Sequence, residues 1–169
     1  MRPQANATME IRNARPEDID MIMEVYAAAK LFMSKNGNKN QWINGYPTED
    51  LIMTDIRAGN CYVCTGSDNE IVGTFFYKQG PDVTYQQIYD GKWLNDHPYG
   101  VVHRLAGSGK AKGVASHCLE RCFNQCKNIR VDTHRDNAVM RNVLKKNGYT
   151  FCGIIYVANG TERLAFQKC

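Results

Sequence analysis

The sequence predicts a mixed α/β domain built on one sheet. Its 169 residues fit a single domain, and 43 % hydrophobic with 22 % charged residues is ordinary for a globular protein with a normal core. Hydrophobic periodicity alternates between that of strands and that of helices along the chain. The resulting order is strand, two helices, three strands, helix, strand, helix and two strands, which is typical of helices packed on one sheet.

The start of the chain and its charge limit the functional classes. Residues 1–8 are polar and lack the apolar core of a secretory signal, so we treat them as an N-terminal arm or expression remnant and residues 9–169 as the domain. The sequence contains no stretch of about 18 uncharged apolar residues, so it predicts no membrane span. The net charge of +4 is compatible with an anionic ligand, but without a lysine/arginine run it predicts no nucleic-acid partner.

Seven cysteines are many for this length. Their odd number and the absence of a signal argue against a secreted disulfide framework, and Cys61-x-x-Cys64 has no second pair at zinc-like spacing. Cys118, Cys122 and Cys126 recur every four residues within the apolar stripe of an amphipathic helix. We therefore expect buried, reduced thiols in a cytoplasmic protein without a bound metal.

The first half of the chain predicts one strand, two helices and two strands. Residues 9–13 form the strand, and Pro16 with two acids behind it starts a helix that continues to about Met33. Thr48, again followed by two acids, is a favourable N-cap for a second helix through about Arg57. Two strands follow at residues 61–65 and 70–78, joined by the Gly-Ser-Asp-Asn turn between them.

The second half begins with an irregular aromatic segment, residues 80–99, and loops of this length are often functional. A central strand follows it. Gly148 ends the last helix, and Asn159-Gly160 favours a tight hairpin turn. The expected elements are strands at residues 99–106, 129–133, 150–157 and 161–167, and helices at 112–126 and 137–147.

The loop between the central strand and the next helix carries the main functional signal. Its residues 107–109 are Gly-Ser-Gly, and Gly113 follows near the start of the helix. Glycines let a backbone approach a ligand closely, and the first helical turn leaves amide groups free at the positive end of its dipole. A pyrophosphate can be bound there by backbone amides, with Lys110 and Lys112 beside it. Neither a Walker A pattern nor a dinucleotide Gly-x-Gly-x-x-Gly pattern fits the segment.

Two motifs make the chain resemble the GNAT superfamily of N-acetyltransferases. The family's acetyl-CoA motif is Gln/Arg-x-x-Gly-x-Gly/Ala, and this chain has Lys110-x-x-Gly113-x-Ala115, with lysine in the first position. The second landmark is an asparagine ahead of a helix that ends in Gly-Phe or Gly-Tyr. Asn137 and the later Asn147-Gly148-Tyr149 match it. The resemblance extends over residues 9–168.

The resemblance implies an acyl-CoA N-acyltransferase fold, with a mostly antiparallel mixed sheet whose central strand is splayed near Leu105. It also implies acetyl-CoA as cosubstrate. The central strand would bind the pantetheine arm, and the loop amides would bind the pyrophosphate. Asn137 would also hydrogen-bond the arm and at the same time act as a helix N-cap. The implied cofactor-binding residues are Leu105, Ala106, Gly107, Lys110, Ala111, Lys112, Gly113, Val114, Ala115, Ser116 and Asn137.

Acetyl transfer needs a neutral amine, a polarised thioester carbonyl and a stabilised leaving thiolate. For the base we select Asp132, where related N-terminal acetyltransferases carry an acid, and His103, whose residue type accepts protons near neutral pH. A hydrogen-bonded histidine on the sheet, a salt bridge of Asp132 with a nearby arginine, and a water chain without a single base remain alternatives. His134 and Asp136 fit capping roles equally well.

The family's usual acid, a tyrosine seven residues after the asparagine, is replaced by Leu144. Tyr149, Tyr156 and Cys152 are the remaining candidates for that role. The segment from Tyr85 to Tyr99, with the loop that holds Trp42 and Tyr46, is expected to wall the acceptor site.

The predicted function is therefore N-acetyl transfer from acetyl-CoA to a primary amine of a small molecule or a protein N-terminus, by direct attack in a ternary complex. A catalytically silent CoA-binding sensor is the alternative. The sequence does not identify the acceptor, and a homodimer is compatible with it.

Overall fold

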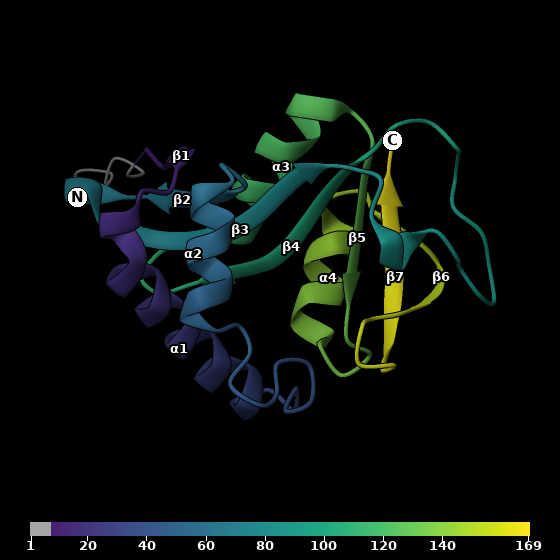
Figure 1. Cartoon of the computed structure of the whole chain (residues 1–169), viewed down its shortest axis with the longest axis horizontal. Coiled ribbons are helices and arrows are strands. Elements are labelled where there is room, and N and C mark those ends of the chain that lie inside the picture. The colour runs from purple at the N-terminus through teal and green to yellow at the C-terminus, as the bar shows by residue number, and fades with distance from the viewer. Residues whose placement is uncertain (1–7) are drawn as a thin grey trace, which may run out of the picture.

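A seven-stranded sheet with the strand order β1-β2-β3-β4-β5-β7-β6 forms the centre of the protein (Figure 1). The computed structural model describes residues 8–169, so the expected arm at residues 1–8 lies outside the described residues except for Thr8. The strands are β1 (Glu10–Asn13), β2 (Cys61–Thr65), β3 (Ile71–Gln79), β4 (Gly100–Gly107), β5 (Ile129–Thr133), β6 (Thr150–Tyr156) and β7 (Glu162–Lys168). The helices are α1 (Ile19–Lys35), α2 (Glu49–Arg57), α3 (Val114–Cys126) and α4 (Ala138–Lys146).

The expected element order is confirmed, and local chemistry explains the helix starts. Thr48 accepts a hydrogen bond from the Leu51 amide at 3.2 Å and caps α2, as its sequence position predicts. The helix expected from Lys112 begins two residues later. Gly113 has φ 74°, a left-handed conformation that cannot continue into a right-handed helix, and therefore stands at the N-cap.

The helices cover opposite faces of the sheet. One apolar cluster joins α1 and α2 to residues such as Val63 and Ala106, and a second joins α3 and α4 to Cys64 and Val102. Because neighbouring residues of a strand point to opposite faces, β2 contributes Val63 to one cluster and Cys64 to the other. A third cluster anchors the segment between β3 and β4, and this segment lies over the β6 and β7 side of the sheet (Figure 1).

The central strands β4 and β5 diverge (Figure 1), which confirms the expected splay. Among the strands of residues 8–169 they are the only parallel neighbours, and they pair from Gly100 to Val102. A bulge accompanies the divergence: between the pairs Thr74–Ala106 and Phe76–His103, two residues of β4 face one residue of β3. Arg104 lies in this bulge with φ 52°. The rest of β4 has β3 on one side and no strand on the other.

The expectation of buried, free thiols holds for five of the seven cysteines, whereas Cys169 is exposed. All seven cysteines are free thiols, and Cys118 and Cys122 lie in the core on α3, whereas Cys126 is half-buried. Within residues 8–169, no helix is long and apolar enough to cross a membrane. The same residues contain no cluster of histidine, cysteine and acidic side chains suited to a metal ion.

Candidate active site

A cavity of about 1140 Å³ opens where β4 and β5 diverge. It extends from the amino end of α3 between the two strands to the loop that joins α1 and α2. Ten of the residues selected from the sequence line it, and eight of them come from β4, the following loop and the start of α3: His103, Leu105, Ala106, Gly107, Ala111, Gly113, Val114 and Ala115. Asp132 and Asn137 line it from the opposite wall.

The loop before α3 presents backbone amides at one end of the cavity. The amides from 111 to 116 donate to no acceptor within the described part of the chain. The loop itself is held by hydrogen bonds from the Ser108 amide to the Val72 carbonyl and from the Lys110 amide to Ser108 Oγ. A Cβ added to Gly113 would meet open space, so nothing fills the volume in front of these amides. The geometry fits an anion such as a pyrophosphate.

Three residues of the predicted cofactor set do not line the cavity. Lys110 and Lys112 are exposed, and Lys110 Nζ lies 2.8 Å from the Glu70 carboxylate. That interaction raises the pKa of Lys110 and partly offsets its charge. Ser116 accepts a hydrogen bond from Asn147 Nδ2 at 2.9 Å and thereby joins α3 to α4.

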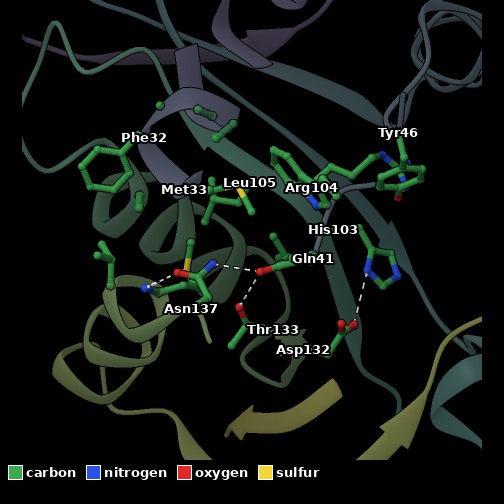
Figure 2. Close-up of a pocket in the computed structure, with 18 of the residues that line it drawn as sticks. Phe32, Met33, Gln41, Tyr46, His103, Arg104, Leu105, Asp132, Thr133 and Asn137 are labelled. Atoms are coloured by element: carbon green, nitrogen blue, oxygen red, sulfur yellow. Dashed lines mark hydrogen bonds and ion pairs between the residues drawn. The ribbon is translucent and has the colours of Figure 1, made fainter. Parts of the chain in front are cut away.

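Gln41, in the loop between α1 and α2, bridges the cavity (Figure 2). Its Oε1 accepts hydrogen bonds from Asn137 Nδ2 at 3.0 Å and Thr133 Oγ1 at 3.4 Å. Asn137 Oδ1 accepts from the Met140 amide, so the expected N-cap of α4 is present. The bridge fixes the Asn137 amide group and ties the α1–α2 loop to β5 and α4.

His103 and Asp132, the two residues selected as bases, lie together across the splay (Figure 2). His103 Nδ1 is 3.7 Å from Asp132 Oδ2, and His103 Nε2 is 2.8 Å from Asp82 Oδ2. Tyr85 donates a hydrogen bond to Asp132 at 2.6 Å. Asp132 forms no ion pair with an arginine within residues 8–169. The structure therefore favours an aspartate–histidine cluster over the salt-bridge alternative.

Two members of the cluster, Asp82 and Tyr85, have shifted pKa values. Burial raises the pKa of the Asp82 carboxyl, but hydrogen bonds from His103 and Thr84 outweigh it and lower the pKa to about 2. Asp82 is therefore an acceptor at neutral pH, which assigns the Nε2 proton of His103 to the shared hydrogen bond. Burial, together with the charge of Asp132, raises the pKa of Tyr85 well above its ordinary value, so Tyr85 remains a donor. His103 Nδ1 faces the Asp132 carboxylate at 3.7 Å.

The candidates for a proton donor to the thiolate do not reach the cavity. Leu144 is fully buried in the core between α3, α4 and the sheet, and Tyr149 is buried with its hydroxyl unpaired. Cys152 is buried and Tyr156 is exposed, and neither lines the cavity. The position that usually holds the family tyrosine is thus a packing position here.

The end of the cavity that the sequence analysis predicts to hold the acceptor differs in part from expectation; it is called the acceptor end below. Trp42 and Tyr46 line it as predicted, but Tyr85 and Tyr99 belong to the core cluster beneath. The segment after β3 contributes Asp82 and Thr84 instead. The sequence analysis missed four residues of this end: Gln41, Asp82, Thr84 and Arg163. Asp82 follows Gly80-Pro81 directly at the end of β3, and this was the only local signal.

The comparisons with known proteins agree with this geometry. The profile of the acetyltransferase (GNAT) family matches residues 24–149, which is more than half of the chain. The chain belongs to the GNAT acetyltransferase family. A GNAT family acetyltransferase from Streptococcus agalactiae 2603 is 34 % identical, with a TM-score of 0.78 over 95 % of this chain and 94 % of that one.

Two more distant structures share the fold. A GNAT family acetyltransferase from Listeria monocytogenes 4b F2365 is 18 % identical, with a TM-score of 0.68 over 95 % of this chain and 94 % of that chain. The NatC complex bound to Gag peptide and CoA contains a chain that is 14 % identical, with a TM-score of 0.58 over 95 % of this chain and 97 % of that chain. A search of curated proteins found no match. Family membership indicates acyl transfer from CoA and a single α/β domain, and leaves the acceptor unspecified.

Proposed function

We propose that this GNAT protein transfers the acetyl group of acetyl-CoA to a primary amine of a small molecule or a protein N-terminus, in a ternary complex. One observation carries the proposal: a single cavity joins the unpaired amides before α3 to a histidine held between two aspartates. The first group of atoms suits a pyrophosphate and the second suits an ammonium group that must lose a proton.

Residues 105–107 and the α3 loop are proposed to hold the cofactor. β4 beyond Val102 has a free edge, so its peptide groups can hydrogen-bond an extended pantetheine arm in the way that they would pair with a neighbouring strand. Amides from Ala111 to Ser116 would bind the pyrophosphate, and Asn137 would bind the arm after exchanging its contact with Gln41. Acetyl-CoA then supplies the thioester to be attacked.

His103 is proposed to be the base, with Asp82 and Asp132 around it. Asp82 holds the Nε2 proton, so Nδ1 can accept a proton from the incoming ammonium group. Asp132, fixed by Tyr85, lies beside Nδ1, where its charge stabilises the imidazolium that forms. A positioned base of this kind contributes typically about 10²- to 10⁴-fold in rate.

The neutral amine then attacks the thioester carbon. A C–N bond forms, the C–S bond breaks and the electron pair leaves with sulfur as the CoA thiolate. A backbone amide on the free edge of β4 can polarise the carbonyl oxygen. Holding both reactants in one cavity supplies the larger share of the rate gain, up to roughly 7–11 kcal/mol. Because Leu144 is buried, the thiolate takes its proton from water or from the imidazolium.

The test is thiol release from acetyl-CoA with a panel of primary amines, together with CoA titration by calorimetry. We expect saturable CoA binding and amine-dependent thiol release. CoA binding without turnover on any amine would support the alternative, a CoA-binding sensor. The seven free thiols suit a reducing compartment, so we also propose a cytoplasmic location.

A further inference from the structure

Arg163 on β7 is a buried cation that lines the cavity. It is 6 % exposed, yet within residues 8–169 no carboxylate lies within 4.0 Å of its guanidinium. Its Nη1 donates to Thr161 Oγ1 and the Glu162 carbonyl, and Nη2 donates to the Gln41 carbonyl at 2.9 Å. All these acceptors are neutral, and Nε donates to none of the described residues. The guanidinium therefore keeps donors and a full charge for a ligand.

Strand register places Arg163 beside the proposed base. Asp132 pairs directly with Ala165 of β7, and Arg163 precedes Ala165 by two residues. Arg163 and Asp132 are thus diagonal neighbours on the same face, a relation that separates Cα atoms by roughly 7–8 Å. His103 faces Asp132 from the other side of the splay. An anion-binding group and a proton acceptor therefore lie side by side in one cavity.

Comparison with the half-buried Arg104 and the buried Arg130 shows what is unusual about Arg163. Arg104 also lines the cavity, but its Nη2 is 2.5 Å from Asp55 and its Nη1 donates to Tyr46. Arg130 lies over the rings of Trp93 and Tyr99, with its carbon Cζ 4.3 and 3.9 Å from the ring centroids, and does not line the cavity. Arg163 alone among these three combines burial, access to the cavity and the lack of a partner with opposite charge or an aromatic face.

Burial of an uncompensated charge is unfavourable unless something offsets it. Burial lowers the pKa of Arg163, and the charge of Asp132 opposes this effect only in part. A ligand anion placed on the guanidinium would supply the missing compensation through charge-assisted hydrogen bonds.

We propose that the acceptor is a primary amine that also carries an anionic group, a carboxylate or a phosphonate, which Arg163 binds while the amine faces Asp132 and His103. This inference rests on the proposed function and narrows its acceptor class. The two groups of the acceptor are separated by few bonds, because Arg163 and Asp132 are adjacent on the sheet.

The test uses matched acceptors with acetyl-CoA. The standard α-amino acids, β-alanine and γ-aminobutyrate are each compared with their carboxamides and with the available aminophosphonates. We expect at least one anionic amine to exceed its neutral partner by about tenfold or more in kcat/KM, mainly through KM. Carboxylate and phosphonate series are measured separately, so the preferred anion is identified.

Variants then assign the preference to one side chain. In Arg163→Gln the ratio of kcat/KM between the anionic amine and its carboxamide should fall towards one, and Arg163→Lys should restore part of it. Arg57→Gln, at the exposed end of α2 and outside the cavity, should keep the wild-type ratio. CoA affinity of each variant is measured by calorimetry, which separates an acceptor effect from a folding or cofactor effect.

Two outcomes overturn the inference without touching the proposed function. One is turnover in which neutral amines or peptide N-termini equal or exceed every anionic amine. The other is a preference that persists unchanged in Arg163→Gln. If no amine supports thiol release, the proposed function fails. Calorimetry of the anionic amines with the CoA complex then still tests whether Arg163 binds an anionic group. No anion-selective, Arg163-dependent binding there would also overturn the inference.

Discussion

The two ends of the cavity are built from different parts of the chain. The end at α3 consists of backbone amides and glycine torsions within one short segment, from Gly107 to Ser116. The other end consists of side chains from separate segments: Gln41 from the first loop, Asp82 from the segment after β3, His103 from β4, Asp132 from β5 and Arg163 from β7. A site made of backbone amides tolerates substitutions that leave the backbone torsion angles unchanged. A site made of side chains depends on the identity of each residue in it.

This difference explains how the family motif and the catalytic position can be independent. The loop motif is retained here although Leu144 replaces the usual tyrosine. The loop presents its backbone amides to the cavity, whereas the Leu144 side chain packs in the core cluster and does not line the cavity. One end can therefore remain a CoA site while the other changes its chemistry.

The largest effect is expected for Gly113→Glu. The substitution places a side chain at φ 74° and a negative charge in the open space before the α3 amides. We expect CoA binding to be lost in calorimetry, because the charge opposes the pyrophosphate there. Gly59→Glu is the matched control, since Gly59 has φ 76°, equally open surroundings and no place in the cavity. Unchanged CoA affinity in folded Gly113→Glu protein would remove the cofactor assignment.

His103→Gln tests the side-chain end. We expect kcat to fall by roughly 10²- to 10⁴-fold, because the proposed base is lost, while CoA affinity stays that of the wild type. The pH dependence of kcat/KM should also lose the limb that reports the base. His97→Gln, in an exposed loop, is the control and should retain full activity. An active His103→Gln enzyme would favour a water chain without a single base.

Leu144→Tyr tests whether the family position is still catalytic in this chain. Because Leu144 is fully buried, the larger side chain should overpack the core and destabilise the fold by about 1–3 kcal/mol in denaturant unfolding. Turnover should not rise. A gain in kcat would show that a hydroxyl at position 144 reaches the thioester, contrary to the packing observed here.

Asp82→Asn tests the hydrogen bonds around His103 through acid stability. The pKa of Asp82 is lowered from 3.8 to about 2, so the ionised carboxylate stabilises the fold above pH 3.8, and this contribution disappears as pH falls through about 2. Solvent screening leaves about 1 kcal/mol for this half-buried group. At pH 7 the free energy of unfolding in urea should be larger for the wild type than for Asp82→Asn by that amount. The two proteins should converge between pH 4 and 2, and parallel curves would contradict the assignment.

The smallest effect is expected for Lys110→Ala. The lysine is exposed and its charge is partly offset by Glu70 at 2.8 Å. We expect CoA affinity to fall only a few fold, and less at high salt, because exposed charges contribute little and are screened. A loss as large as that in Gly113→Glu would mean that side chains, and not amides, hold the pyrophosphate.

The sequence alone determined the element order and two helix N-caps, and it located the loop proposed to bind the cofactor. Thr48 and Asn137 are local signals, because side-chain capping is decided by a few neighbouring residues. For the same reason the acetyl-CoA motif could be read as a short string. Two helix starts differ from expectation: α3 begins two residues later, and α1 begins three residues later because Pro16–Asp18 forms a separate 3-10 turn.

Only the tertiary structure decided the acceptor end. His103 and Asp132 could be selected from the sequence, but their contact depends on where β4 and β5 diverge. Asp82 reaches His103 from 21 residues away along the chain, and Arg163 reaches the cavity through its register with β5. Strand register and long-range packing are set by the whole sheet, and no local pattern encodes them. The sequence thus located the loop that is proposed to bind the cofactor, and the fold determined which side chains line the cavity beside it.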